Sequence, residues 1–382
     1  MRDPVPALFS ALPHLSETVP WMALGAFPTP VERVIGLISP SVELWVKRDD
    51  QSGGARESGP GGGGEEVAAL YGGNKVRKLE FLLAEARASG ARRLATVGGI
   101  GSHHVLATAL YGARAGFEVE AVVFPQPVTD HVREQILADV AAGARLTPTR
   151  GLIGVPSAVR RARRASGTAW IAPGGSSVAG TLGYVSAGLE LRAQVARGEL
   201  PAPDVVYAAL GSCGTVAGLL VGLGGAGAPD GRLPTGGGPE VVGVRVVDRV
   251  VCNARKTLAL ARATRFRILP PDGKRPISEL ARLRVEHRFF GGAYGRSTPE
   301  ADEAVRRASE VGLLLEPTYT GKALAALLAD AQAGRLDGKR VLFLHSYSGV
   351  DLSPLLARAP AAATLPPLLR RHFVGGGGGT AH

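Results

Sequence analysis

The sequence predicts an α/β protein built from two parallel-sheet domains with helices on both faces of each sheet. Short apolar segments typical of buried strands alternate along the chain with helical repeats of about ten to fifteen residues, the pattern expected of parallel sheets covered by helices. Glycine-rich turns connect several of these strands to the helices that follow. A chain of 382 residues is also too long for a single typical core, which favours two domains.

Apolar periodicity places the regular elements. Segment 42–47 alternates apolar and polar residues, so it predicts a strand that delivers the dipeptide Asp49-Asp50. A helix follows from Lys78, where leucines recur at helical spacing, and Gly90 supplies its C-cap. The other expected strands are 94–97, 119–124, 169–173, 205–210, 241–247, 313–315 and 341–345, and the other expected helices are 103–115, 131–141, 182–196, 215–223, 253–263, 299–311 and 321–333.

Three segments are too rich in glycine, proline or serine to form regular elements. The run 51–66 cannot bury enough apolar surface to order itself, so we expect a mobile surface loop there. The spacer 224–239 interrupts the alternation of strands and helices. The tail 370–382 contains five consecutive glycines and is expected to be disordered.

The net positive charge suggests nucleic acid as a possible partner. A formal net charge of +11 is compatible with nucleic-acid binding. The excess, however, comes from arginines spread over predicted helices with almost no aromatic residues between them, which is typical of solvated helix faces. We therefore expect no nucleic-acid partner, although charge alone leaves that reading open.

The sequence favours a cytoplasmic protein that does not enter membranes. The first ten residues lack the apolar run of a signal peptide, and no window holds about 18 uninterrupted apolar residues. Cys213 and Cys252 are the only cysteines, too few for a disulfide framework and without the spacing of metal ligands. We therefore expect a reducing compartment and no metal.

The stretch G-G-N-K-V-R-K-L-E, residues 72–80, is the first candidate site. Lysine occurs at only seven positions in the chain, yet Lys75 and Lys78 lie within four residues, just after paired glycines and at the start of a helix. Positive charge from Arg77 and Lys78, together with the helix N-terminus, would lower the pKa of Lys75 and suit it to Schiff-base chemistry. The alternative is a pair of surface lysines on an exposed helix start.

The stretch G-S-C-G-T, residues 211–215, follows an apolar strand and opens an apolar helix. Backbone N–H groups in such a turn, with the helix dipole behind them, can bind a phosphate without a charged side chain. The stretch is neither a Walker P-loop nor a dinucleotide fingerprint. A tight strand-to-helix turn without a ligand is the alternative.

The stretch G-G-I-G-S-H-H, residues 98–104, also lies between a strand and a helix. Ser102 either caps the helix or offers its hydroxyl, with the amides that follow, to a substrate carboxylate and to proton transfer. His103 and His104 lie beside it. No G-x-S-x-G elbow is present, which argues against a serine hydrolase.

Two C-terminal stretches complete the candidates. Tyr319, in E-P-T-Y-T-G-K, follows a proline and precedes a helix, so its phenol is expected to point into a cleft. Ser346 or Ser348, in H-S-Y-S-G, follows an apolar strand and is placed to hydrogen-bond a heterocyclic nitrogen.

Taken together, these stretches resemble the pyridoxal-phosphate enzymes of the D-cysteine desulfhydrase and 1-aminocyclopropane-1-carboxylate deaminase family, which have the tryptophan synthase β-like fold, fold type II. The resemblance covers most of the chain in the order of the family. The matching stretches are F-P-T-P (27–30), K-R-D-D (47–50), G-G-N-K-V-R-K-L-E (72–80), G-G-I-G-S-H-H (98–104), P-G-G-S-S (173–177), L-G-Y (182–184), G-S-C-G-T (211–215), G-A-Y-G (292–295) and E-P-T-Y-T-G-K (316–322).

The resemblance implies a role for each candidate residue. Lys75 would form the Schiff base with pyridoxal 5'-phosphate, and Lys78 would contact the phosphate beside the glycine turn. Ser102 would lie next to the substrate, and Tyr319, with Tyr294 beside it, would supply active-site phenols. The expected catalytic residues are Lys75, Ser102 and Tyr319; the cofactor-binding residues are Lys75, Lys78, His103, Gly211, Ser212, Cys213, Gly214, Thr215, Ser346 and Ser348; and the substrate-binding residues are Ser102, His103, His104, Tyr294 and Tyr319.

The resemblance also implies an architecture. It predicts a large cofactor domain formed by residues 1–78 and 180–369, with the glycine-rich loop 51–66 as an insertion. A smaller domain, residues 79–179, would be inserted into it. The family further implies a homodimer.

Some positions depart from the family pattern. His103 replaces an asparagine that contacts the ring hydroxyl of the cofactor, and Cys213 replaces a glycine or a small polar residue in the phosphate turn. The serine loop H-S-Y-S-G is one residue longer than its counterpart, and the glycine-rich run replaces a D-D-L-T-G segment. Thr320 stands where the deaminases have a glutamate that keeps the pyridine nitrogen protonated.

Because Thr320 cannot supply that carboxylate, the sequence favours β-elimination from a small amino acid. We expect a lyase similar to D-cysteine desulfhydrase, which would release pyruvate, ammonia and sulfide. The alternatives are a 1-aminocyclopropane-1-carboxylate deaminase and a pyridoxal-phosphate-binding homologue without turnover.

Overall fold

The structure, a computed structural model, describes residues 5–53, 71–224, 238–270 and 279–373. Most of the expected loop 51–66, of the spacer 224–239 and of the tail 370–382 lies outside the described residues. The chain forms two compact units. Unit 1 comprises the described residues within Met1–Arg56, Leu70–Glu85 and Gly174–Gly349, and unit 2 those within Ala86–Pro173 and Val350–His382.

Unit 1 is built on a six-stranded sheet with the strand order β1-β2-β10-β7-β8-β9. All neighbouring strands are parallel except the pair β1 and β2, which is antiparallel. The predicted α/β class is therefore confirmed, with one antiparallel edge. The strands are β1 (Val31–Val34), β2 (Glu43–Arg48), β7 (Val205–Leu210), β8 (Glu240–Arg245), β9 (Arg282–Glu286) and β10 (Arg340–His345).

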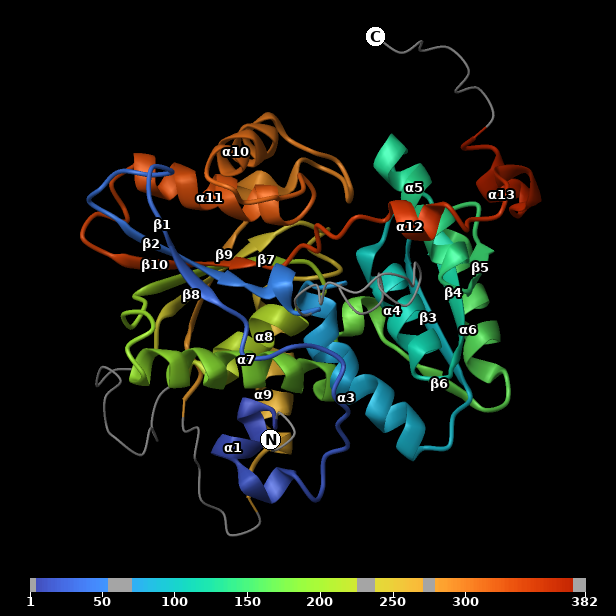
Figure 1. Cartoon of the computed structure of the whole chain (residues 1–382), viewed down its shortest axis with the longest axis horizontal. Helices are drawn as coiled ribbons and strands as arrows, with labels where there is room; N and C mark the ends of the chain where they lie inside the picture. Colours follow the sequence, from blue (N-terminus) through green and yellow to red (C-terminus); the bar gives the residue numbers. More distant parts are fainter. Residues whose placement is uncertain (1–4, 54–70, 225–237, 271–278, 374–382) are drawn as a thin grey trace. The chain divides into compact units, whose positions relative to one another are not determined.

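Helices cover both faces of this sheet, as Figure 1 shows. One hydrophobic core lies between the sheet and α1, α7, α8 and α9, and a second lies between the sheet and α10 and α11. Within β7, Val206 and Leu210 belong to the first core, whereas Val205 and Tyr207 belong to the second, because successive side chains of a strand point to opposite faces. The helices are α1 (Ala7–Ala11), α3 (Asn74–Ala88, of which residues 74–85 are in this unit), α7 (Val178–Ala196), α8 (Gly214–Gly222), α9 (Ala254–Arg267), α10 (Pro299–Glu310) and α11 (Thr320–Gln332).

Unit 2 is built on a four-stranded parallel sheet with the order β5-β4-β3-β6. Alanine and valine side chains of β3 and β4 form a small core with α6. Although the sequence analysis assigned residues up to 369 to the large domain, α12 packs against α5 in this unit. The elements are β3 (Arg93–Gly99), α4 (His103–Arg114), β4 (Glu118–Phe124), α5 (Asp130–Ala141), β5 (Ala144–Pro148), α6 (Val155–Arg164), β6 (Thr168–Trp170), α12 (Ser353–Leu356) and α13 (Pro367–Arg370).

Several elements differ from the expectation. Strands β1, β5 and β9 were not predicted, because each is an edge strand whose charged residues interrupt the apolar run. Helix α6 was missed because only two of its residues, Ala158 and Ala162, are buried. The strand expected at 313–315 is wrong: Leu313 and Leu315 fill the second core from the connection between α10 and α11.

Two further observations bear on function. Within the described ranges, no helix combines the length and the apolar character needed to span a membrane. The same ranges contain no cluster of three or more histidine, cysteine or acidic side chains arranged to hold a metal ion.

Candidate active site

The loop after β10 fixes the start of α3. Gly73 has a φ of +87°, a left-handed conformation that glycine adopts without a steric cost. The Asn74 N–H donates to the carbonyl of Ser346 at 3.1 Å, and the Gly72 N–H donates to Ser348 Oγ at 3.0 Å. A Cβ at Gly73 would lie 2.8 Å from the Ser346 carbonyl oxygen, so the two segments approach as closely as glycine permits.

Lys75 lies in the first turn of α3 and donates from Nζ to Asn74 Oδ1 at 2.6 Å. Burial lowers the pKa of Lys75 from its ordinary value of 10.5 to about 8, and the negative charge of Glu316 opposes that change. From the sequence, such a lowering was expected from the positive charges of Arg77 and Lys78. The lowering is as expected, but its main cause is loss of solvent around the amine.

Lys78 lies one turn further along α3 and is 1% exposed. Its Nζ donates to the carbonyl of Gly174 at 3.0 Å. Burial lowers the pKa of Lys78 well below its ordinary value, and the nearby charge of Lys75 lowers it further. A Cβ at Gly214 would lie 3.2 Å from Lys78 Nζ, so this amine adjoins the turn that opens α8.

The turn at residues 211–215 connects β7 to α8. Ser176 Oγ donates to Ser212 Oγ at 2.8 Å and accepts from the Gly214 N–H at 3.0 Å, so two separate stretches form one polar cradle. A Cβ at Gly174 would lie 2.1 Å from Ser212 Oγ, which shows how closely these stretches approach. The first N–H groups of α8 have no partner within the helix and carry the positive end of its dipole, as anion binding requires.

Cys213, in the middle of this turn, has a φ of 71° and is the only residue other than glycine with a positive φ in the described part of the chain. It forms a disulfide bond with Cys252, which lies just before α9, and the two Cα atoms are 6.0 Å apart. This bond was not anticipated from the sequence. It ties the turn to the loop that follows β8.

Two tyrosines meet beside the same turn. The hydroxyl groups of Tyr294 and Tyr319 lie 2.6 Å apart, and a Cβ at Gly211 would lie 3.3 Å from the ring of Tyr319. Burial, and then Tyr294, raise the pKa of Tyr319 well above its ordinary value, so this phenol remains protonated. Glu316 accepts from the N–H groups of Tyr319 and Thr320, both at 2.8 Å, and so anchors the start of α11.

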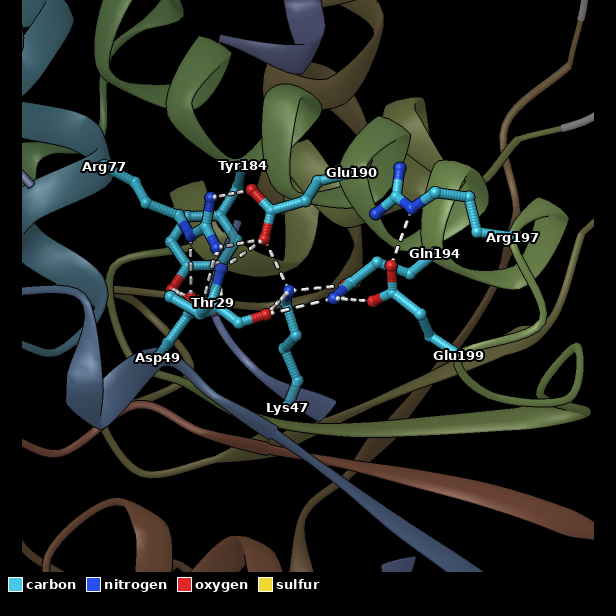
Figure 2. A network of polar contacts seen from close by, with 9 residues as sticks. All are labelled: Thr29, Lys47, Asp49, Arg77, Tyr184, Glu190, Gln194, Arg197 and Glu199. Atoms are coloured by element: carbon cyan, nitrogen blue, oxygen red, sulfur yellow. Dashed lines mark hydrogen bonds and ion pairs between the residues drawn. The ribbon is translucent and has the colours of Figure 1, made fainter. Parts of the chain in front are cut away.

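The opposite face of α3 carries a buried ionic network, which Figure 2 shows. Arg77 donates to Asp49 from Nε at 3.0 Å and from Nη2 at 2.8 Å. It also donates to Glu190 from Nη1 and from Nη2, both at 2.9 Å. The hydroxyl groups of Tyr184 and Thr29 also donate to Asp49, at 2.6 and 2.8 Å.

Lys47 joins this network from β2. Its Nζ donates to Glu190 at 2.5 Å, to Gln194 at 2.7 Å and to the carbonyl of Thr29 at 2.7 Å, so three acceptors surround its three protons. Two cations, Lys47 and Arg77, therefore face two carboxylates with good geometry, as a buried ionic cluster requires. These contacts connect α3 to β2 and α7.

Ser102, His103 and His104 belong to unit 2. Ser102 is the N-cap residue of α4, but its side chain makes no capping hydrogen bond. The ring of His103 lies 5.3 Å from that of His131. His104 is 3% exposed, and its Nε2 lies 2.9 Å from Thr96 Oγ1, so it packs inside the unit.

Comparison with known proteins gives a consistent result. The family model described as "Pyridoxal-phosphate dependent enzyme" matches residues 65–346. The chain belongs to this family. It is 32% identical to a D-cysteine desulfhydrase of Salmonella paratyphi A over 348 residues, which cover 88% of this chain and 95% of the relative.

Solved structures agree with this assignment. The crystal structure of an ACC deaminase homologue superposes with a TM-score of 0.69 at 26% identity and covers 93% of this chain and 100% of its own. A fungal L-serine ammonia-lyase from Rhizomucor miehei, at 16% identity and a TM-score of 0.56, shares the fold; the match covers 88% of this chain and 98% of that protein. The expected tryptophan synthase β-like fold, fold type II, is confirmed, and pyridoxal phosphate is the cofactor of the family.

Unit 1 fits this cofactor. Pyridoxal phosphate needs an amine that is neutral part of the time, and Lys75, with a pKa of about 8, meets that requirement. Its phosphate needs a cradle of backbone N–H groups, and the turn between β7 and α8 offers one beside Lys78. The cradle is narrow because Cβ atoms at Gly174 and Gly214 would fill it.

The structure brings together the candidates of unit 1 around the beginning of α3, α8 and α11. Ser348 already holds the Gly72 N–H, so its hydroxyl has a structural partner. Three residues of this region were not among the predicted site residues: Asn74, Ser176 and Glu316. Ser176 lies in the quoted stretch P-G-G-S-S and Asn74 directly precedes Lys75, so their positions in the sequence were the available signals.

Proposed function

We propose that the protein is a lyase that removes the β substituent of a small amino acid, and that it releases pyruvate, ammonia and sulfide from D-cysteine. The observation that carries this proposal is the Lys75 amine, which is partly buried, has a pKa of about 8 and lies on the same helix as Lys78 beside the β7–α8 turn. D-cysteine desulfhydrases at 32% identity support the substrate class.

In this proposal Lys75 binds the cofactor covalently, while Lys78 and the turn at residues 211–215 hold its phosphate. When bound, the cofactor supplies an electron sink that stabilises negative charge at the substrate α-carbon. The Lys75 amine would take the α-proton of the substrate; Ser102 is the alternative base. Lys78 supplies positive charge for the phosphate without forming a covalent bond.

The two phenols serve a different purpose. Tyr319 is protonated at neutral pH, and because burial and Tyr294 raise its pKa it keeps its proton in more alkaline solution than an ordinary tyrosine. It therefore acts as a hydrogen-bond donor toward the substrate, and its partner Tyr294 orients the hydroxyl. The family resemblance, and not the geometry of unit 1, is the support for Ser102 and His103 as further contacts.

Spectroscopy and product analysis test the proposal together. The purified protein with pyridoxal phosphate should absorb visible light as a lysine-bound cofactor and release pyruvate from D-cysteine. Lys75→Ala should lose both properties, whereas Lys256→Ala, at an exposed lysine of α9, should keep them. If Lys75→Ala retained the absorbance and full turnover, the assignment would be wrong.

A deaminase that opens 1-aminocyclopropane-1-carboxylate is the second candidate, favoured by the likeness to the ACC deaminase homologue. Against it, Thr320 Oγ1 lies 3.2 Å from Glu316 and is 1% exposed, so this position serves the start of α11 and supplies no carboxylate to a ring nitrogen. We expect little 2-oxobutanoate from that substrate. Bound cofactor without turnover on either compound would instead support a binding homologue.

We further propose that the enzyme is a homodimer and works in the cytoplasm, as the family resemblance implies. Light scattering of the purified protein tests the first statement. The Cys213–Cys252 bond is the observation against the second, because disulfides are rare in reducing compartments. Free thiols are counted in protein that has been alkylated inside the cells that produce it. Two free thiols would support the cytoplasm, and none would support an oxidising compartment.

A further inference from the structure

Asn74 links the Lys75 amine to the first turn of α8. Asn74 Oδ1 accepts from Lys75 Nζ at 2.6 Å, and Asn74 Nδ2 donates to Thr215 Oγ1 at 3.2 Å. Since the amide nitrogen is directed to the threonine hydroxyl, the amide oxygen is the end that faces the lysine. One side chain thus joins the reactive amine to the turn that adjoins Lys78.

The backbone of Asn74 is held as firmly as its side chain. Its N–H donates to the Ser346 carbonyl at 3.1 Å, and the preceding Gly73 has no space for a side chain. Asn74 is also the first residue of α3. Its amide therefore offers Lys75 a fixed acceptor.

This acceptor is neutral, as is the backbone carbonyl that accepts from Lys78, whereas the buried Lys47 has a charged acceptor. Lys47 donates to the carboxylate of Glu190, which favours the ammonium form. An amide oxygen accepts a hydrogen bond from an ammonium and from a neutral amine alike. The Glu316 carboxylate already accepts from backbone N–H groups at the start of α11.

We propose that Asn74 is a positioning residue that holds the Lys75 amine toward the β7–α8 turn whenever this amine is not bound to the cofactor. The inference rests on the proposed function. It describes the amine as the cofactor-free structure shows it, and the same contact would form whenever the amine is free during turnover. During turnover Asn74 would hold one N–H of Lys75, leaving the nitrogen lone pair to accept the α-proton while the electrons of the broken C–H bond remain on carbon.

Amine labelling of the cofactor-free protein tests the proposal. Lys75 is acylated with acetic anhydride over a range of pH and quantified by peptide mass spectrometry. In the wild type, the pH at which labelling of Lys75 is half-maximal should lie near 8. Asn74→Asp should raise it by about one unit, which means about tenfold less labelling at pH 7, because a carboxylate favours the ammonium form.

The rate of cofactor attachment distinguishes an effect on the position of the Lys75 amine from an effect on its protonation. Above its own midpoint, Asn74→Asp should bind pyridoxal phosphate as fast as the wild type, because it keeps an acceptor in place. Asn74→Ala should remain several-fold slower at every pH.

The other asparagine of the chain, Asn253, provides a matched control. It also lies at a helix start, where its side chain accepts from the Lys256 N–H at 3.0 Å. Asn253→Ala should leave the Lys75 midpoint and the attachment rate unchanged. If Asn74→Ala and Asn74→Asp behaved like this control, the proposal would fail. If even the wild type never gained the visible absorbance of attached cofactor, the proposed function would fail, while the labelling midpoints would still decide the position of Lys75.

Discussion

The pKa values of the cations on the two faces of α3 shift in opposite directions. Arg77 lies two residues after Lys75, about 200° around the helix. Burial acts to lower the pKa of Arg77, but Asp49 and Glu190 raise it well above its ordinary value. On the other face, burial lowers the pKa of Lys75 to about 8 and lowers that of Lys78 as well.

Counter-charge explains the difference. Carboxylates around a buried cation oppose the loss of its proton, whereas neutral acceptors do not; burial lowers the pKa of Lys47 even beside Glu190, although that carboxylate opposes the change. Lys75 donates to an amide and Lys78 to a backbone carbonyl, whereas Arg77 donates to two carboxylates. One face therefore anchors the helix, and the other keeps its amines reactive.

The largest expected effect comes from removing one carboxylate from the ionic network around Arg77. Glu190→Gln leaves two buried cations, Lys47 and Arg77, with one carboxylate between them. Breaking a buried pair in this way should lower the free energy of unfolding by about 3–5 kcal/mol. Urea denaturation measures the loss. Glu303→Gln, at the exposed partner of Arg306, is the control and should leave the midpoint unchanged.

The next largest effect is expected from the disulfide, which holds the β7–α8 turn by a covalent bond and not by charge. Reduction of Cys213–Cys252 should lower the free energy of unfolding by about 2–4 kcal/mol, because it frees the unfolded chain from a closed loop. Denaturation with and without a reductant tests this. Cys252→Ser should show the lower stability at once and no further response to the reductant; an equal response in both proteins would contradict the prediction.

A smaller effect, of opposite sign, is expected on the reactive face. Lys75→Met removes a cation that burial disfavours, and should stabilise the cofactor-free protein by about 1–2 kcal/mol at pH 7. The folded pKa is about 8 against 10.5 for the free side chain, so the penalty is complete below pH 8 and disappears as the pH rises to 10.5. The stability difference between variant and wild type should therefore shrink over that range. The exposed Lys339→Met should show neither effect.

The smallest effect concerns the cradle. Ser176→Ala removes the hydroxyl that contacts Ser212 and the Gly214 N–H. The loss of one such set of hydrogen bonds should weaken cofactor binding by about fivefold, or roughly 1 kcal/mol. Equilibrium dialysis with pyridoxal phosphate gives the affinity. Ser157→Ala, on the exposed surface of α6, serves as the reference, and equal affinities for both variants would remove Ser176 from the site.

Much of the sheet of unit 1 was predictable because local sequence patterns determine its strands. The apolar runs of β7, β8 and β10 identify strands buried on both faces, and the glycine turn after β7 follows from its place between a strand and a helix. Charged edge strands escaped prediction because only one side of each is paired, so their composition resembles that of a loop.

The sequence by itself determined the α/β class, the placement of Lys75 and Lys78 at the start of α3, and the resemblance to pyridoxal-phosphate enzymes. Only the tertiary structure decided what surrounds those lysines. Arg77 meets Glu190 across 113 residues, and Asn74 meets Thr215 across 141. Apolar periodicity and propensity describe neighbours along the chain, whereas the pKa of an amine depends on charges and solvent brought close by folding. That is why the lowered pKa of Lys75 was anticipated and its cause, burial beside a neutral amide, was not.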